Sequence, residues 1–323
     1  MFLEKSPNNG QSPKNWNRQG EACVLGDLKE FGPEMRDSVS LERARYYCRQ
    51  LTKNHYENFS VASRLVPSGF RQHLANVYSF CRWADDLSDE IASNEESVAM
   101  LNWWRESLYR CYEGDCRHPV FVALSDTISQ FKIPIDPFEK LIDAFCVDQR
   151  KFRYATDGEV LEYCSGSANP VGRILLFMVG KHNDQTIPLS DSICSGLQIA
   201  NFCQDVRRDA ARDRIYLPWT YWSKHQLTES SILNGGQQEQ LRDALSEWAM
   251  FARGMLQDGL PLVSLVPLWL ARDLQLFVRG GLHLLDELAR NDYDSWTKSI
   301  EVSKVAKLKL ILRAWFSPRS LVP

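Results

Sequence analysis

Apolar residues recur at intervals of three and four positions from about residue 38 to the end of the chain. The stretches LERARYYCRQL, VAMLNWWRESLYRCY and LQLFVRGGLHLLDELA have this spacing, which gathers apolar side chains on one face of an α-helix. The alternation that is typical of strands is scarce. The sequence therefore predicts an all-α fold, in which breakers such as residues 67–69 and 234–236 separate roughly eight to ten helices.

The first 36 residues differ in composition from the rest of the chain. They are rich in Asn, Gly, Pro and Ser, a composition that buries little surface, so we expect a flexible N-terminal arm over residues 1–36. No linker or repeat interrupts the remainder, and a chain of 323 residues with 44% apolar content can bury a large core. We expect one domain over residues 37–319, followed by a tail, residues 320–323, that resembles the stub of an engineered cleavage site.

Charge and cysteine content exclude some classes of protein. A formal net charge of −3 gives no basic footprint for nucleic acid, whose binding requires clustered Lys and Arg. The nine cysteines contain no CxxC pair, and an odd number without a signal peptide favours reduced thiols. No stretch approaches 18 uninterrupted apolar residues. We expect a cytoplasmic protein without a membrane span, with room for peripheral contact with the inner membrane face.

The stretch RWADDLSDE, residues 82–90, concentrates four carboxylates within one helical segment. At 100° per residue, four side chains fall within a band of roughly 60°: Tyr78, Arg82, Asp85 and Asp89. Taken alone, the pattern is typical of a solvated helix face on which Arg82 pairs with Asp86. Asp86 and Glu90 lie off the band, and we expect both to be solvated.

A second stretch, residues 196–218, repeats the arrangement as GLQIANFCQDVRRDAARDRIYLP. Four polar side chains share a band of roughly 80°: Gln198, Asn201, Asp205 and Asp209. Apolar neighbours such as Ile199 and Phe202 indicate a helix packed inside a bundle. Like charges at i,i+4 repel, and more strongly away from water, so we expect a cation between them.

Two acidic faces of this kind suit Mg²⁺, which takes oxygen ligands and bridges protein carboxylates to substrate phosphates. Facing each other across a cavity, they would hold a diphosphate. Arg82, Arg212 and Arg214 would then neutralise the diphosphate as it leaves. The alternative at this point is a pair of ordinary charged helices, with Arg207, Arg208 and Arg212 as surface partners.

Together these stretches resemble the paired signatures of squalene and phytoene synthases. YSFCRWADDLSDE and QIANFCQDVRRDAARDRIYLP stand in the family's order, with NFSVASRLVP before the first and EYCSGSANPVGRILL between them. The resemblance covers most of residues 45–310 and is strongest to the hydroxysqualene synthase branch of bacterial hopanoid biosynthesis. It implies the class I isoprenoid (terpenoid) synthase fold, an α-helical bundle with a central active-site cavity.

The resemblance also implies roles for the matching residues. Two or three Mg²⁺ ions would be held by Asp85, Asp89, Asn201, Asp205 and Asp209. The substrate would contact Tyr78, Arg82, Asn58, Ser60, Tyr163, Gln198, Asn201, Arg214 and Lys298. Of these, the catalytic residues would be Tyr163, Arg82 and Tyr78.

Some of these residues also have an ordinary structural explanation. Tyr163 would serve equally as a core phenol with a satisfied hydroxyl, and Asn58 and Ser60 as parts of a helix cap. The small residues 166–168 would let a prenyl chain approach the helix, or would serve close packing between helices.

The sequence departs from the family pattern NxxRDxxED at two positions. Gln204 replaces the arginine before Asp205, and Arg208 replaces the glutamate before Asp209, so a cation is moved rather than lost. We expect this altered charge to favour a preformed presqualene diphosphate over the condensation of two farnesyl diphosphates. Lys298 stands where the family has an arginine, and SANPVG replaces VAGxVG.

The implied reaction is a Mg²⁺-dependent lyase reaction. Diphosphate leaves presqualene diphosphate, the resulting cation rearranges in an apolar and aromatic cavity, and water ends it as hydroxysqualene. NADPH is not expected. Two alternatives stay open: a prenyl transferase that condenses two allylic diphosphates head to head, and an inactive helical scaffold, against which the intact aspartates argue. The expected partners are a prenyl diphosphate and neighbouring enzymes of the squalene and hopanoid pathway.

Overall fold

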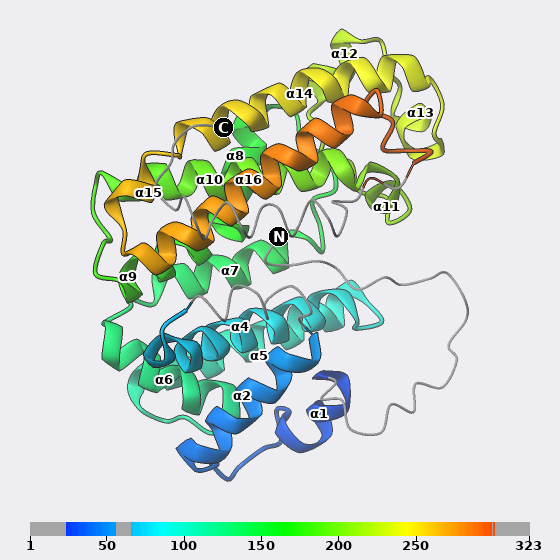
Figure 1. Cartoon of the computed structure of the whole chain (residues 1–323). Coiled ribbons are helices and arrows are strands. Elements are labelled where there is room, and N and C mark those ends of the chain that lie inside the picture. Colours follow the sequence, from blue (N-terminus) through cyan, green and yellow to red (C-terminus); the bar gives the residue numbers. More distant parts are fainter. Residues whose placement is uncertain (1–23, 56–65, 299, 301–323) are drawn as a thin grey trace. The chain divides into compact units, whose positions relative to one another are not determined.

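The computed structural model describes residues 24–55, 66–298 and 300 (Figure 1). These residues form fifteen helices and no strand, apart from one isolated parallel bridge between Arg153 and Ile215. The all-α prediction is confirmed. The number of helices exceeds the prediction because four of them have only four to six residues: α11 (Val206–Ala210), α12 (Trp219–Lys224), α13 (Glu229–Asn234) and α15 (Leu262–Leu265).

The chain divides into two compact units, residues 1–135 and 136–323, and each is described by itself. We call them unit 1 and unit 2. The single domain over residues 37–319 and its central cavity stay predictions. Within the described ranges, no helix combines the length and the apolar character that crossing a bilayer requires. The eight described cysteines are all free thiols.

Unit 1 is built around a long helix, α4 (Ser68–Asp89), whose most extensive packing is against three helices: α2 (Leu41–His55), α5 (Asn94–Glu113) and α6 (Pro119–Phe131). Its core is aromatic. The rings of Trp83 and Trp104 stack 5.3 Å apart at an angle of 9°, and Trp104 lies 4.4 Å from Phe121. Because Trp83 is fully buried, these contacts fix the rotation of α4 about its axis and hence the direction of its other faces.

Part of the expected N-terminal arm is structured. Helix α1 (Val24–Phe31) contacts α4, and its Asp27 accepts a hydrogen bond of 2.6 Å from the hydroxyl of Tyr47. Phe31 meets the ring of Tyr47 edge-on at 5.3 Å. Composition indicated an arm up to residue 36, but two buried apolar side chains, Val24 and Phe31, anchor this stretch to unit 1. Residues 1–23 lie outside the described part of the chain.

Unit 2 is centred on α10 (Thr186–Gln204), which packs against α14 (Gln238–Asp258) and α16 (Leu268–Arg290) (Figure 1). A glycine permits the close approach of α10 and α14. A Cβ atom at Gly196 would lie 3.1 Å from the backbone oxygen of Ala252 and 3.0 Å from Leu256. Besides the four short helices, unit 2 contains α7 (Asp136–Val147), α8 (Asp157–Ser167) and α9 (Asn169–Met178).

Candidate active site

Helix α4 carries the first acidic cluster, which we define as Arg82, Asp85, Asp86, Asp89 and Glu90. Three of its members are buried: Arg82 is 6% exposed, Asp85 5% and Asp86 2%. A charged side chain removed from water requires a partner of opposite charge, so a solvated helix face does not explain this burial. The prediction that Asp86 is solvated is wrong, whereas Glu90 is exposed as expected.

Arg82 forms ion pairs with three acids of the cluster. Arg82 Nη2 forms a close ion pair with Asp86 Oδ1, Nη1 lies 3.5 Å from Asp85 Oδ2, and Nη2 lies 3.8 Å from Glu90 Oε1. Burial opposes the charge of Arg82, but the carboxylates of Asp86 and Asp85 outweigh it and hold its pKa above the ordinary value. Burial raises the pKa of the Asp86 carboxyl to about 8, and the charges of Glu90 and Asp85 add to this, while the charge of Arg82 lowers it. The sequence predicted the i,i+4 pair of Arg82 with Asp86 but not its burial, because helical angles do not show which face the neighbouring helices cover.

Tyr78 lies one turn before Arg82 and is 7% exposed. Burial is the main cause that raises the pKa of its phenol far above 10, with further contributions from the charges of Asp85 and Asp86. Its hydroxyl therefore keeps its proton at neutral pH and can donate a hydrogen bond. Most of α4 from Ala75 onward is buried, including Tyr78, Arg82 and Asp85, and the face that these three residues share with the half-buried Asp89 stays a prediction.

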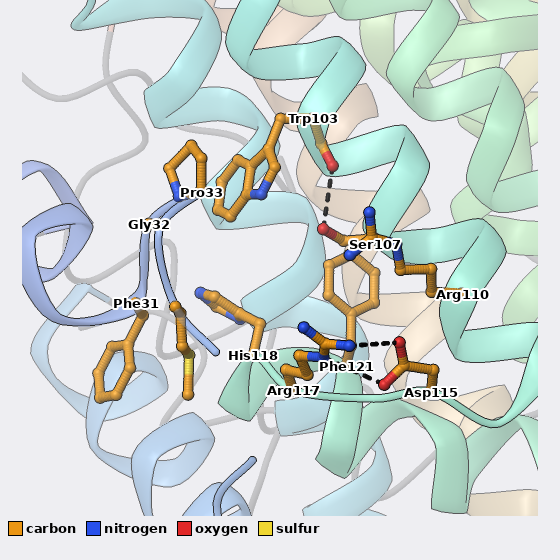
Figure 2. Close-up of a pocket in the computed structure, with 11 residues that line it drawn as sticks. Phe31, Gly32, Pro33, Trp103, Ser107, Arg110, Asp115, Arg117, His118 and Phe121 are labelled. Carbon is orange, nitrogen blue, oxygen red and sulfur yellow. Dashed lines mark hydrogen bonds and ion pairs between the residues drawn. The ribbon is translucent and has the colours of Figure 1, made fainter. Parts of the chain in front are cut away.

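Figure 2 shows a small hollow of about 40 Å³ in unit 1, lined by parts of α5, α6 and the segment after α1. His118 forms part of its wall, with its ring 4.4 Å from Trp83 and nearly perpendicular to it. Burial lowers the pKa of His118 to about 3, so the imidazole is neutral. None of the predicted site residues lines this hollow, and its volume holds little more than a water molecule.

In unit 2 the second acidic cluster, defined as Asp205, Arg208 and Asp209, spans a helix break. α10 ends at Gln204 and α11 begins at Val206, and Asp205 between them has φ −95° and ψ 13°. The hydrogen-bond ladder nevertheless continues, because Asp205 N donates to Asn201 O and Asp209 N donates to Asp205 O, both at 2.9 Å. The predicted succession of polar residues is thus retained, although one straight helix was expected.

The two positions that depart from the family pattern both have partners. Arg208 Nη1 lies 3.2 Å from Asp205 Oδ2, so the moved cation pairs with a predicted metal ligand. Gln204 is neutral, and its Nε2 donates to the backbone oxygen of Ile300 at 2.5 Å. The position before Asp205 therefore contributes a structural hydrogen bond and no positive charge.

The chain turns back after α11. The backbone N–H groups of Arg212 and Arg214 both donate to Asp209 O at 2.9 Å, and Asp213 between them has a φ of +57°. Asp209 itself is 6% exposed. This turn brings Arg214 back beside the second acidic cluster, and its Nη2 donates to the backbone oxygen of Asp148 at 3.2 Å.

Asp148 is a residue that sequence reasoning missed. It follows α7, is 7% exposed, and accepts a hydrogen bond of 3.0 Å from the hydroxyl of Tyr163 through Oδ2. The hydroxyl of Tyr163 is therefore satisfied, as the structural explanation required, and its partner is a buried carboxylate. The signal available in the sequence was a lone aspartate directly after the amphipathic stretch PFEKLIDAFCV.

Aromatic rings gather around this carboxylate, and we call Tyr154, Tyr163, Phe202 and Tyr216 the aromatic cluster. Phe202 and Tyr216 stack 3.8 Å apart at 7°, and Tyr216 lies 5.8 Å from Tyr163 and 5.6 Å from Tyr154. Burial raises the pKa of the Tyr163 and Tyr216 phenols well above 10, and the charge of Asp148 adds to this. The charge of Asp209 also acts on Tyr216, so the cluster adjoins the second acidic cluster.

The other predicted residues are less informative. Gln198 and Asn201 are half-buried on α10, and Lys298 is exposed near Asp294. Asn58 and Ser60 lie outside the described residues. Of the small residues 166–168, Gly166 approaches α7 closely, because a Cβ atom there would lie 3.3 Å from a backbone oxygen, which supports the packing explanation.

The donors available in both units fit Mg²⁺, since they are carboxylate and amide oxygens rather than thiols or imidazoles. In the described ranges, no three His, Cys, Asp or Glu side chains come together as a complete metal site. Mg²⁺ commonly takes only one or two protein carboxylates and completes its shell with water and phosphate oxygens. The chemistry of the donors thus matches a metal that is bound together with a diphosphate.

Comparison with known proteins identifies the family. Residues 52–309 match the squalene/phytoene synthase family. The chain is 30% identical over 308 residues to a phytoene synthase of Arthrospira platensis, which covers 90% of this chain and 98% of that protein.

Solved structures agree. The crystal structure of squalene synthase HpnC from Alicyclobacillus acidocaldarius is 40% identical, with a TM-score of 0.75 over 78% of this chain and 95% of that one. A dehydrosqualene synthase in complex with a ligand, 23% identical, has a TM-score of 0.76 over 85% of this chain and 96% of that one, and shows the fold. The chain therefore belongs to the squalene/phytoene synthase family and has its class I isoprenoid synthase helical fold.

Proposed function

We propose that the protein is a hydroxysqualene synthase. In this reaction the C–O bond of presqualene diphosphate breaks, diphosphate leaves with the bonding electron pair, and the cyclopropylcarbinyl cation rearranges with opening of its ring. A water molecule then adds to the cation and loses a proton, which gives hydroxysqualene and diphosphate. No hydride is consumed, so NADPH is not required.

We propose that each acidic cluster, the second together with α10, offers oxygen donors that hold Mg²⁺ together with a diphosphate. The ligands are Asp85, Asp89, Asn201, Asp205 and Asp209. When bound, Mg²⁺ supplies a Lewis acid that stabilises the charge of the leaving diphosphate.

Arg82 and Tyr78 act as donors to the leaving group. The charge of Arg82 is permanent, and its Nε has no hydrogen-bond partner among the described residues, so this N–H is available to a phosphate oxygen. The buried phenol of Tyr78 keeps its proton and is a second donor. Donors that are already oriented before the reaction stabilise developing charge without a reorganisation cost.

The aromatic cluster acts on the carbocation. The faces of Tyr163, Phe202 and Tyr216 carry the negative side of the ring quadrupole, which attracts a cation. Asp148 holds the Tyr163 hydroxyl at 3.0 Å and so fixes the orientation of that ring. Because these phenols are neutral, they stabilise the cation without forming a bond to it.

One observation carries the choice of presqualene diphosphate: the position before Asp205 is a neutral amide bound to Ile300, and the nearby cation, Arg208, is paired with Asp205. A condensation of two allylic substrates has to neutralise two diphosphates, whereas the ionisation of presqualene diphosphate has to neutralise one. The squalene synthase HpnC structure, at 40% identity, supports the same branch.

A second candidate is a head-to-head prenyl transferase that condenses two allylic diphosphates. The observation in its favour is the 30% identity to the Arthrospira platensis phytoene synthase over 98% of that protein. The inactive scaffold is the weakest alternative, because burying Asp85 and Asp209 is costly in a protein that does not use them.

The test is to incubate the purified protein and Mg²⁺ separately with presqualene, farnesyl and geranylgeranyl diphosphates, with and without NADPH. Products are identified by mass spectrometry. We expect hydroxysqualene from presqualene diphosphate without NADPH. Turnover of an allylic diphosphate without hydroxysqualene would support the transferase, and no release of diphosphate from any substrate would support the scaffold.

A further inference from the structure

Arg214 lies in a loop between α11 and α12, and the residue before it has an unfavourable backbone conformation. Asp213 has a φ of +57°, in the left-handed region, which residues other than glycine adopt less readily, although aspartate is among those that tolerate it. Such a conformation persists only where surrounding contacts hold it. The backbone bond from Arg214 N to Asp209 O is one of these contacts.

Arg153 provides the others. Its Nη1 donates to the backbone oxygen of Asp213 in a short hydrogen bond, and its Nη2 lies 2.6 Å from Asp213 Oδ1. The same guanidinium donates through Nε to Glu229 Oε1 of α13 at 2.9 Å. Its planar fork therefore binds both the main chain and the side chain of the residue that precedes Arg214, a pairing that lysine cannot reproduce.

The backbone beside Arg153 reinforces this contact. Ile215 N donates to Phe152 O at 2.9 Å, in the parallel bridge between Arg153 and Ile215. The residues on both sides of Arg214, Asp213 and Ile215, are thus bound to the segment 152–153. On the other side of the loop the Arg214 side chain reaches Asp148, the residue that holds Tyr163.

We infer that Arg153 is a positioning residue for Arg214. It holds the backbone of Asp213 so that the Arg214 guanidinium stays beside Asp148 and the aromatic cluster. Arg153 itself acts on the substrate only through Arg214. The inference rests on the proposed function for the role of Arg214 at the departing diphosphate.

An ordinary surface ion pair would not have this effect. The side chain of Arg153 is 28% exposed and its partners are more exposed still, so its contribution to the free energy of unfolding is small. Its effect on the position of the Arg214 guanidinium matters more, because a misplacement of about 1 Å of a group that acts in the transition state costs about 100-fold in rate. The two effects are separable by experiment.

The test compares R153A, R153K, R214A and the double variant R153A/R214A, with R253A as the matched control. Arg253 is 33% exposed and pairs with Asp286 at 2.6 Å, so its loss removes a similar surface ion pair from the same unit. For each variant, kcat, KM and the melting temperature are measured with whichever prenyl diphosphate the wild-type protein turns over.

We expect R153A to lower kcat about 10- to 100-fold with little change in KM, while its melting temperature stays close to that of R253A. R153K is expected to lower kcat nearly as much, because lysine keeps the positive charge but lacks the planar guanidinium that binds two acceptors at once. When Arg214 is already replaced, as in R153A/R214A, the R153A substitution should lower kcat no further.

Full kcat in R153A, or a loss that multiplies with that of R214A, would overturn the inference. If R153A does not fold, R153K decides between the same outcomes. Failure of the proposed function is seen separately in the wild-type protein, which would then form no hydroxysqualene from presqualene diphosphate, whatever the R153A variant does.

Discussion

The two acidic clusters share the pattern DxxxD but are built differently. In the first, Arg82 and the acids that it pairs with all lie on α4 or just after it, and the side chains of Arg82 and Asp86 are 8% and 3% exposed. In the second, the acids span a helix break, and the side chains of Arg208 and Asp205 are 40% and 35% exposed. Both clusters bury an acid, since Asp209 is 6% exposed, but the ion pair of the first cluster is buried and that of the second is half-exposed.

The difference extends to the arginines that would meet the diphosphate. Arg82 is held by neighbours within eight residues on the same helix, so its position follows from helical geometry. Arg214 is held by contacts with Asp148 and, through Asp213, with Arg153, both some sixty residues earlier in the chain. The first arginine depends on secondary structure, and the second depends on tertiary structure.

The largest expected effect is on stability. R82A leaves Asp86 buried without its counter-charge, and removing one partner of a buried ion pair costs about 3–5 kcal/mol. R208A removes a half-exposed pair, for which about 0–1 kcal/mol is expected. Urea unfolding of the two variants measures this contrast. Equal losses would show that the first cluster is not more strongly coupled to the fold than the second.

Both clusters should matter equally for turnover. D85N and D209N are expected to lower kcat about 10²–10³-fold, as the loss of one group that stabilises the leaving charge does. Both should also require more Mg²⁺ for half-maximal rate. Kinetics over a Mg²⁺ titration checks this, and either variant with full activity at the wild-type Mg²⁺ requirement would refute the metal assignment for its cluster.

The bond between Tyr163 and Asp148 tests the long-range construction of unit 2. Y163F removes a hydrogen bond to a carboxylate, which is worth about 1.5–3 kcal/mol. The matched control is Y154F, because the Tyr154 hydroxyl is buried and has no hydrogen-bond partner among the described residues. Thermal unfolding should therefore separate the two variants. If Y154F lowered stability as much as Y163F does, the hydrogen bond to Asp148 would not be the cause of the Y163F effect.

The smallest expected effect is on the pH dependence of stability, which has opposite sign in the two units. Burial lowers the pKa of His118 in unit 1 from 6.5 to about 3, so the unfolded chain binds the proton first and stability falls as the pH drops below 6.5. Burial raises the pKa of Asp273 in unit 2 from 3.8 to about 7, so stability falls as the pH rises from 3.8 through 7.

Melting temperatures at pH 5 and pH 8 check both signs. The melting temperature of D273N, relative to that of the wild-type protein, should be higher at pH 8 than at pH 5. The decrease in melting temperature caused by H118Q should be smaller at pH 5 than at pH 8. A pH-independent difference in either variant would mean that the residue is not titrating in the folded state as its burial implies.

The sequence predicted what depends on short-range geometry. Periodicity identified an all-α chain, and the i,i+4 spacing of Arg82 and Asp86 predicted their ion pair. Helical angles missed the burial of Asp86, because they do not show which faces of α4 the neighbouring helices cover. They also predicted an unbroken helix through Asp205, where the chain turns away from ideal helical dihedrals.

What the sequence could not predict depends on tertiary contacts. Asp148 belongs to none of the motifs, and its importance follows from Tyr163 and Arg214, which lie 15 and 66 residues away in the chain. Arg153 likewise acquires its role only when the loop of Asp213 folds back against it. Composition assigned α1 to the flexible arm. It could not show the buried contacts of Val24 and Phe31, because these form only when unit 1 is folded.

The most direct test of the proposed function is the source of the product oxygen. Purified protein is incubated with presqualene diphosphate and Mg²⁺ in H₂¹⁸O without NADPH, and the lipid products are analysed by mass spectrometry. The account predicts hydroxysqualene that carries ¹⁸O from water, together with released diphosphate. Unchanged presqualene diphosphate, alongside conversion of farnesyl or geranylgeranyl diphosphate to a hydrocarbon or to presqualene diphosphate, would contradict it.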